Sequence, residues 1–444
     1  MNTIGIIAEY NPFHKGHAHQ LQELRRKYPD STLLVVMSGD FVQRGTPAIF
    51  SKFHRAQWAV MGGADIVFEL PSMFSVSSAE YFAAGGLRLL DALECDAISF
   101  GASHTQVEEL VSIAKTLDHP STQESLRAFL EQGYSYGTAL RKATQLFHSV
   151  SSSSTEDFLG QNISDTMLAS TEQEASENNV LENANHIRIL DTDPNTILGI
   201  EYIRALHRYH IELNIIPVER TSSHHNPTLG DSLPSGTALR NAIYASSLLE
   251  ESDSKWHQYL PPIVSPLARD IVQANYYANL NHYYDMIHLT SRVVTKKELQ
   301  TLHDMSDGLE DAWLTASALS SWEQARESLK SRRYTYSRLD RIASYSLFRR
   351  TKEIFQKCHQ QGPTYGRLLA FNDRGRQYLR EKRASIPIVQ KWAPFCQQAT
   401  GISKILCEQD QLASRLWRLT VDNPRYRDSH YDYTTSPVYV QNPI

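Results

Sequence analysis

The chain has 444 residues, a formal net charge of −5 and a sequence pI near 6.4. Because one hydrophobic core rarely grows beyond about 250–300 residues, this length predicts two or more domains. The acidic balance excludes a basic field over the whole chain, so any contact with nucleic acid must be local.

The cysteines and the apolar segments narrow the class further. The four cysteines lack zinc-finger or CxxC spacing, which argues against a disulfide framework and against structural zinc, and we predict no protein metal site. The N-terminus lacks the pattern of a signal peptide, and no stretch reaches the ~18–20 apolar residues of a membrane helix. We therefore expect a cytoplasmic protein with no membrane partner.

The first hundred residues alternate between two patterns. Short apolar, β-branched runs are separated by segments with helical spacing, and this alternation predicts an α/β fold with a parallel sheet covered by helices on both faces. The predicted strands are 3–9, 32–39, 64–70 and 96–102, and the predicted helices are 17–28, 52–63 and 78–93.

The composition changes twice after this region. Residues 149–179 are rich in Ser, Glu, Asp and Asn, which predicts a mobile insertion that extends to about 185. A helix at 197–209 and a strand at 212–221 then resume the α/β pattern. Strand signals fade from about 250, where long amphipathic stretches predict a mainly helical part. The expected domains are therefore 1–248, of the α/β type, and 249–444, mainly helical.

The stretch EYNPFHKGHAHQL, residues 9–21, lies between the first predicted strand and the first predicted helix. Ligands of open α/β sheets bind at this edge, and a helix N-terminus favours an anionic group. Gly16 would let a phosphate approach the backbone, and His14 and His17 could stabilise charge on phosphoryl oxygens. Zinc binding through His14, His17 and His19, or ordinary surface histidines, are the alternatives. No GxxxxGK[ST] or GxGxxG follows the first strand, which excludes the common phosphate loops.

A second motif, LPSGTALRNAIY at 233–244, opens a later predicted helix. Ser235 and Thr237 could cap this helix and donate to a phosphate, and Arg240 could clamp the same phosphate. Ser-Gly-Thr is also simply a good helix cap. The two motifs in one α/β domain are much rarer than either alone.

With these blocks in place, the chain resembles the tRNA(Met) cytidine acetate ligases, within the HIGH-superfamily nucleotidyltransferases. The resemblance rests on GIIAEYNPFHKGH, VVMSGDFVQRGTPAIFSK, VFELP, SFGAS, PNTILGIEY and SGTALR, and continues through RRYTYSRLDRI and YGRLLAFNDRGRQYL. It implies a Rossmann-like nucleotidyltransferase domain at 1–248 that binds ATP, followed by a mainly helical domain at 249–444 that binds tRNA.

The resemblance also implies an activity. Acetate would be activated as acetyl-adenylate with ATP accompanied by Mg²⁺. The acetyl group would then pass to the exocyclic amine of the wobble cytidine of elongator tRNA(Met), without acetyl-CoA. The expected catalytic residues are His14, His17, Lys52 and Arg240, with Lys15 as an alternative to Lys52. The expected ATP-binding residues are Ile7, Ala8, Glu9, Tyr10, Asn11, Pro12, Phe13, His14, Lys15, Gly16, His17, Ala18, His19, Gln20, Gly101, Asn195, Arg220, Thr221, Ser235 and Thr237. Arg44 and Lys52, in the loop after the second strand, could face the same cleft or be solvated.

A local basic segment lies at 330–357, where nine Lys and Arg residues stand against two acidic ones. Tyr334, Tyr336 and Tyr345 interleave with them, a combination suited to RNA loops, although such charge runs are more often solvated helix faces. The candidate RNA-binding residues are Arg332, Arg333, Tyr334, Arg338, Arg341, Arg349 and Arg350. Two other functions stay open, a nucleotidyltransferase that adenylylates a small phosphate ester and a nucleotide-sensing RNA-binding protein without turnover.

Overall fold

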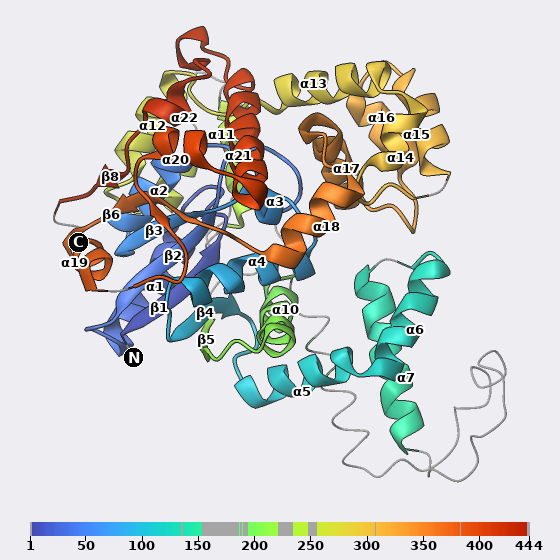
Figure 1. The fold of residues 1–444 in the computed structure, drawn as a ribbon, viewed down its shortest axis with the longest axis horizontal. Coiled ribbons are helices and arrows are strands. Elements are labelled where there is room, and N and C mark those ends of the chain that lie inside the picture. The colour runs from blue at the N-terminus through green and yellow to red at the C-terminus, as the bar shows by residue number, and fades with distance from the viewer. Residues whose placement is uncertain are drawn as a thin grey trace.

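A computed structural model describes residues 2–134, 136–152, 186, 189, 194–220, 234–246, 255–306, 308–381 and 383–441. Its centre is an eight-stranded sheet in the order β5-β4-β1-β2-β3-β6-β7, with β8 also paired to β6 (Figure 1). The strands are Thr3–Ala8 (β1), Thr32–Ser38 (β2), Ile66–Leu70 (β3), Ala97–Ala102 (β4), Asn214–Glu219 (β5), Gly366–Phe371 (β6), Ile388–Val389 (β7) and Val438–Tyr439 (β8). Strands β1 to β5 are parallel, so the predicted α/β fold with a parallel sheet is confirmed.

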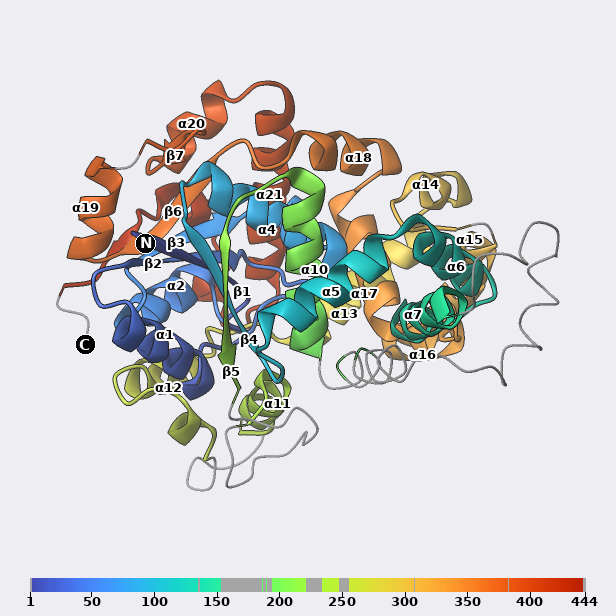
Figure 2. The ribbon, with the colours of Figure 1, turned by 90° about the horizontal axis from the view of Figure 1, so that it is seen from below.

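Helices cover both faces of this sheet (Figure 2). In the first half they are Lys15–Lys27 (α1), Lys52–Met61 (α2), Ser72–Ser75 (α3), Ala79–Ala92 (α4), Val107–Asp118 (α5), Pro120–Glu131 (α6), Tyr136–Ser152 (α7), Pro194–Tyr209 (α10) and Gly236–Ser246 (α11). In the second half they are Ser265–Gln273 (α12), Leu280–Val293 (α13), Lys296–Thr301 (α14), Leu309–Ser317 (α15), Trp322–Leu329 (α16), Tyr336–Phe348 (α17), Lys352–Gln361 (α18), Asp373–Glu381 (α19), Trp392–Gln398 (α20), Gly401–Leu419 (α21) and Tyr431–Thr434 (α22), with short 3-10 turns at Trp256–Tyr259 and Pro424–Tyr426.

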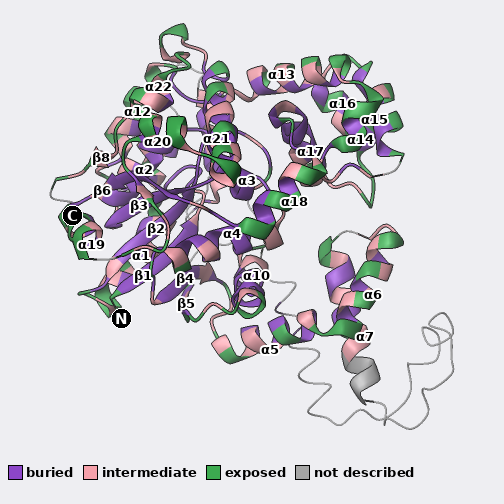
Figure 3. Cartoon of the chain, viewed as in Figure 1, coloured by how far each residue is buried: buried purple, intermediate pink, exposed green. Residues whose placement is uncertain are grey.

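Side chains alternate between the two faces of each central strand. Leu33 and Val35 of β2 pack into one buried cluster with α1, α2, α11 and α12, whereas Leu34 and Val36 pack into another with α4, α5, α10 and much of the C-terminal half. Burial on both faces explains why the strands read as nearly continuous apolar runs. Figure 3 shows this buried centre beneath a more exposed ring of helices.

The C-terminal half is mainly helical, as expected, but it also returns to the sheet. The fading strand signal after residue 250 missed β6, which pairs antiparallel with β3, and the short strands β7 and β8 beside it. Strand β6 is only six residues long and follows a helix-rich stretch, so its sequence pattern does not clearly predict a strand. Helices α13 to α17 form a lobe beside the sheet (Figure 1).

Two expectations from the sequence fall partly or wholly outside the described residues. The expected domain boundary at 248 lies in 247–254, and most of the Ser-rich insertion lies in 153–185. The described helices include none that is both long and apolar enough to cross a membrane.

Candidate nucleotide site

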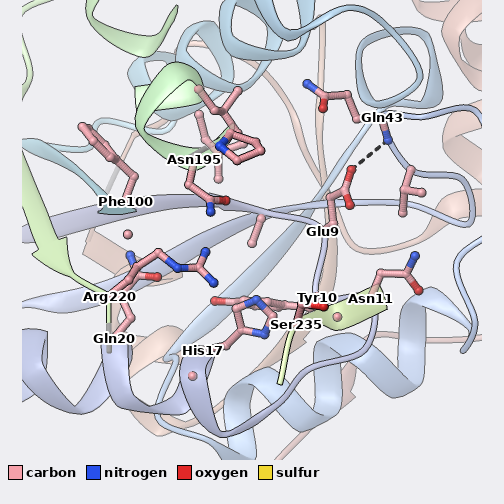
Figure 4. Close-up of a pocket in the computed structure, with 18 of the residues that line it drawn as sticks. Glu9, Tyr10, Asn11, His17, Gln20, Gln43, Phe100, Asn195, Arg220 and Ser235 are labelled. Atoms are coloured by element: carbon pink, nitrogen blue, oxygen red, sulfur yellow. Dashed lines mark hydrogen bonds between the residues drawn. The ribbon is translucent and has the colours of Figure 1, made fainter. Parts of the chain in front are cut away.

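A cavity of about 460 Å³ opens beyond the carboxyl ends of β1, β4 and β5 (Figure 4). This is the edge at which open α/β sheets bind ligands. Most of the predicted ATP-binding and catalytic residues line it: Ile7, Ala8, Glu9, Tyr10, Asn11, His14, Gly16, His17, His19, Gln20, Gly101, Asn195, Arg220, Ser235, Thr237 and Arg240. Pro12, Phe13, Lys15 and Ala18 belong to the same segment without lining the cavity, and Thr221 lies outside the described residues.

His14 and His17 form the first turn of α1 together. His14 is the N-cap, and its Nδ1 accepts from the backbone N–H of Gly16 at 3.1 Å. His17 Nδ1 accepts in turn from the backbone N–H of His14 at 3.3 Å, and the two rings stack with centroids 3.8 Å apart. Each imidazole therefore uses Nδ1 as an acceptor, which leaves Nε2 as the donor.

Electrostatics keep His17 neutral. Burial lowers its pKa well below the usual value, and the neighbouring His14 and Arg220 lower it further. A neutral imidazole donates a hydrogen bond to a phosphoryl oxygen without adding a full charge. A Cβ on Gly16 would come within 2.9 Å of the His14 ring, so the glycine makes room for this ring.

The second motif, SGTALR at 235–240, lines the cavity from the first turns of α11. The Ser235 hydroxyl accepts from the backbone N–H of Ala238 at 3.2 Å, in the manner of a helix cap. Arg240 Nη1 donates to the carbonyl oxygen of Asn11 at 2.6 Å, and Nη2 donates to the Thr237 hydroxyl at 3.0 Å. Burial lowers the pKa of Arg240, which nonetheless stays a cation, so one positive charge is fixed beside the histidines.

Three further predicted residues meet at the other side of the cavity. Gly101 is the next-to-last residue of β4, Arg220 follows β5, and Asn195 lies in the first turn of α10, and all three line the cavity. A Cβ on Gly101 would lie 3.2 Å from the Arg220 side chain, so the glycine allows the close approach of Arg220. Figure 4 shows Arg220 and Phe100 on one side and Glu9 and Gln43 on the other.

Lys52 does not belong to this site, which corrects its predicted catalytic role. Its side chain is 1% exposed, and Nζ lies 2.8 Å from Asp432, 3.0 Å from Glu69 and 3.4 Å from Asp40. Burial and the neighbouring Arg367 oppose its charge, but the three carboxylates raise the pKa of Lys52. The side chain is an internal counter-ion that ties α2 to the C-terminal half. Its neighbour Arg44, by contrast, lines the cavity and is exposed.

The sequence reasoning missed residues that shape the site. Arg55 of α2 is fully buried and donates to four backbone carbonyls, those of Glu9, Ser38, Gly39 and Phe50. It therefore holds the ends of β1 and β2 together. Tyr202 and Gln43 also line the cavity. Gln43 stands in the FVQRG block and Tyr202 in the PNTILGIEY block. Both blocks carried the family resemblance, which could have marked these two residues as candidates for the site.

Candidate RNA-binding residues cluster around α17. Arg332, Arg333 and Arg349 are exposed, and Arg338 and Arg341 are half-buried. Arg338 pairs with Asp304 at 2.8 Å.

Tyr334 is held within this cluster by several contacts. The guanidinium groups of Arg333 and Arg338 both lie over the Tyr334 ring. The Tyr334 hydroxyl also hydrogen-bonds that of Ser306 at 2.6 Å.

Arg350 corrects the RNA prediction. Its side chain is 0% exposed and donates to Gln409, to the carbonyl oxygens of Ser72 and Val76, and to the Ser72 hydroxyl. Tyr345 is also buried, so neither side chain can touch RNA. The basic segment contains buried positions as well as exposed ones, and the residue types alone did not distinguish them.

One loop joins the cavity to α17. The loop after β2 carries Gln43 and Arg44 into the cavity, and the next residue, Gly45, accepts through its carbonyl oxygen from Ser344 of α17 at 2.6 Å and from Tyr283 of α13 at 2.5 Å. Gly45 has φ +84, and a Cβ there would lie 2.5 Å from the Ser344 hydroxyl. Only glycine combines this backbone conformation with this close approach.

The parallel sheet, the HxGH turn and the arginine of the later helix define a nucleotidyltransferase of the HIGH class. The model of the HIGH nucleotidyl transferase family matches residues 1–432. A tRNA(Met) cytidine acetate ligase of Alkaliphilus metalliredigens is 31% identical over 99% of both chains, and one of Acetivibrio thermocellus is 31% identical over 98% of this chain and 99% of its own. The chain belongs to the tRNA(Met) cytidine acetate ligase family, which confirms the resemblance.

Solved structures agree with this assignment. The crystal structure of Thermotoga maritima TmcAL bound with alpha-thio ATP matches over 100% of both chains with a TM-score of 0.81 and 27% identity. The apo form of the same protein matches over 100% of both chains with a TM-score of 0.82 and 26% identity.

Proposed function

We propose that this protein acetylates the wobble cytidine of elongator tRNA(Met) in two steps that consume ATP and acetate. The observation that carries the proposal is the cavity itself, where the HxGH turn, Arg240 and the loop leading to the basic helix α17 converge. The names of the relatives support the same reaction, and the ligand of the Thermotoga maritima protein supports ATP as the nucleotide. In this function the protein works in the cytoplasm, and the C-terminal half supplies the RNA-facing part.

In the first step an acetate oxygen attacks the α-phosphorus of ATP, and the bond to the bridging oxygen breaks to release pyrophosphate. Acetate is already a nucleophile, so the protein needs to stabilise charge on the leaving phosphates more than it needs a base. Nε2 of His14 and His17, the guanidinium of Arg240 and the hydroxyls of Ser235 and Thr237 surround the space for those phosphates. The adenosine end lies against Gly101, Asn195 and Arg220.

The second step needs a good leaving group next to an amine. The exocyclic amine of the cytidine attacks the acetyl carbon, the carbon–oxygen bond to AMP breaks, and one proton leaves the nitrogen. Because the mixed anhydride already carries the activation, acetyl-CoA has no part in this scheme.

The side chains that line the cavity fit a metal ion that is bound mainly by the phosphates of the nucleotide. No group of three or more His, Cys, Asp or Glu among the described residues could hold a metal ion. Mg²⁺ commonly keeps several waters and binds through phosphate oxygens with one or two carboxylates, and Glu219, which ends β5 and lines the cavity, would be the carboxylate beside it. A bound Mg²⁺ would offset charge on the triphosphate.

The experiment that tests this function is acetate-dependent ATP–pyrophosphate exchange, followed by mass spectrometry of the nucleosides of tRNA(Met) incubated with ATP and acetate. Exchange together with acetylcytidine is the expected result. Adenylylation of a small phosphate ester in place of exchange would establish the plain nucleotidyltransferase. Binding of ATP and tRNA without either product would establish a nucleotide-sensing RNA-binding protein.

A further inference from the structure

The cavity contains a carboxylate that nucleotide binding does not explain. Glu9 lines the cavity beside cationic and donor groups that suit phosphates and acetate, and its charge acts on the neighbouring Arg240. A carboxylate repels both ATP and acetate, so its favourable partner in the cavity must be a hydrogen-bond donor or a cation.

The position of Glu9 is fixed by the loop after β2. One carboxylate oxygen, Oε1, accepts from the backbone N–H of Gln43 at 2.9 Å, the bond drawn in Figure 4. No hydrogen bond to the other oxygen, Oε2, occurs among the described residues. Arg55 holds the backbone carbonyl of Glu9. The carboxylate is therefore oriented in advance and keeps one oxygen for a ligand.

Two donors near this carboxylate lack a partner among the described residues. The Tyr202 hydroxyl and the Gln43 side-chain amide nitrogen are buried and make no hydrogen bond to any described residue, and both residues line the cavity, as does Tyr10, whose hydroxyl is likewise buried. Tyr202 is 1% exposed, and burial together with the charge of Glu9 raises its pKa, so its hydroxyl keeps its proton. A buried donor without a partner is uncommon in folded proteins and needs an explanation, and for two donors in one cavity a bound ligand supplies it.

The three groups match one base edge. Cytosine presents an amine donor at N4 and acceptors at N3 and O2, whereas uracil presents an acceptor at O4 and a donor at N3. Glu9 as the acceptor with Gln43 and Tyr202 as donors complements cytosine and opposes uracil. The side of the cavity holding Glu9 and Gln43 also lies opposite Arg220 (Figure 4), the side left over when adenosine lies against Arg220.

We propose that Glu9 binds the exocyclic amine of the acceptor cytidine and takes its proton when the amine attacks acetyl-adenylate, while Gln43 and Tyr202 donate to the base. This inference rests on the proposed function. In the step itself the nitrogen–carbon bond forms, the bond between the acetyl carbon and the AMP oxygen breaks, AMP keeps that electron pair, and the N4 proton moves to the Glu9 carboxylate.

Glu9→Gln is the sharpest test because the amide oxygen can still accept from the Gln43 N–H while the charge and the proton acceptor are lost. We compare acetate-dependent ATP–pyrophosphate exchange with acetyl transfer from synthetic acetyl-adenylate to tRNA(Met), which bypasses the first step. We expect the transfer rate to fall roughly 30-fold or more beyond any fall in exchange. Glu23→Gln on the exposed face of α1 is the matched control and leaves both rates unchanged.

A binding measurement gives a readout that does not depend on turnover. The affinity for tRNA(Met) is compared with that for the same tRNA carrying uridine at the wobble position, without ATP. We expect the wild-type protein to prefer cytidine by about 10-fold and Glu9→Gln to narrow the preference to about 3-fold or less. Gln43→Ala keeps the backbone N–H that holds Glu9 and is expected to weaken cytidine binding alone.

Three outcomes overturn the proposal. If the rates of exchange and of acetyl transfer fall equally in Glu9→Gln and both recover at raised Mg²⁺, Glu9 is a ligand of the metal that accompanies ATP. Unchanged transfer would remove its role in the second step, and an unchanged preference for cytidine would remove its role in base recognition. Failure of the proposed function itself is distinguishable, because the wild-type protein would then give neither exchange nor acetylcytidine.

Discussion

Arg240 Nη1 donates to the carbonyl oxygen of Asn11 at 2.6 Å, across 229 positions of sequence. The bond joins the late Ser/Thr motif to the HxGH segment, so neither motif is complete without the other. It also aims the guanidinium along the phosphate side of the cavity, since Nη2 is held by Thr237.

Arg240→Ala is therefore expected to slow adenylate formation by about 10²–10³-fold, the effect typical of removing a preorganised donor to a developing charge. ATP–pyrophosphate exchange at saturating acetate measures it. Arg240→Lys should recover only a minor part, because one ammonium cannot replace the fork of donors that reaches Asn11, Thr237 and a phosphate. Full activity of the lysine variant would contradict this account.

His14 is expected to show two separable roles. His14→Ala removes the N-cap and should cost about 1 kcal/mol of unfolding free energy in addition to activity. His14→Asn restores the cap without the imidazole, so it should recover the stability measured by urea unfolding while exchange stays low. For both variants, adenylate formation should fall far more than tRNA affinity, and an equal loss of the two would point to misfolding.

Lys52→Met is expected to act on stability. Removing the ammonium takes the ion-pair partner from Asp40 and leaves Asp432 and Glu69 with Arg367 alone, and breaking a buried pair from one side costs about 3–5 kcal/mol. Denaturant unfolding measures the loss. The fraction that stays folded should retain exchange activity, and a stable but inactive variant would restore the catalytic role of Lys52.

The exposed arginines before α17 are expected to act on RNA alone. The double variant Arg332→Glu, Arg333→Glu should weaken tRNA binding by roughly tenfold or more. The affinity should also depend less on salt, because each lost phosphate contact lowers by nearly one the slope of log affinity against log salt concentration. Filter binding at several salt concentrations measures both. Exchange without tRNA should not change, and Arg26→Glu on α1, also exposed, is the control. Equal weakening by the control would argue against a local RNA surface.

Acid is expected to destabilise the fold through buried histidines. Burial lowers the pKa of His303 to about 4, so its native state stays neutral while the unfolded chain takes up a proton near pH 6.5. A lowered native pKa gives stability that is present above pH 6.5 and lost as the pH falls from 6.5 toward 4, about 2 kcal/mol for this group at pH 5.

His303→Phe tests this prediction because the new ring can still stack on Phe355, whose centroid lies 3.4 Å from that of His303. The variant should show a smaller drop in Tm between pH 7 and pH 5 than the wild-type chain. An identical drop would mean that His303 is protonated in the folded state.

The local patterns predicted β1 to β5 and the HxGH turn well, because burial on both faces leaves a continuous apolar run and a helix N-terminus follows the first strand directly. They could not place Lys52, because a lysine in a loop after a strand looks the same whether it faces a cleft or meets three carboxylates from distant segments. Arg350, in the short link between α17 and α18, is the same case. Glu9, Gln43 and Tyr202 come from separate blocks, and only the fold brings them to one wall of the cavity.

The antiparallel pairing of β6 with β3 has a consequence for how the protein is made. Residues 66–70 leave the ribosome long before residues 366–371, so β3 has a bare edge for most of synthesis. An open strand edge invites pairing with another chain, and a chain interrupted before β6 would carry that hazard permanently. The sheet that carries the cavity is thus completed only after α17 has been made, so a chain able to activate acetate already contains the surface proposed to bind RNA.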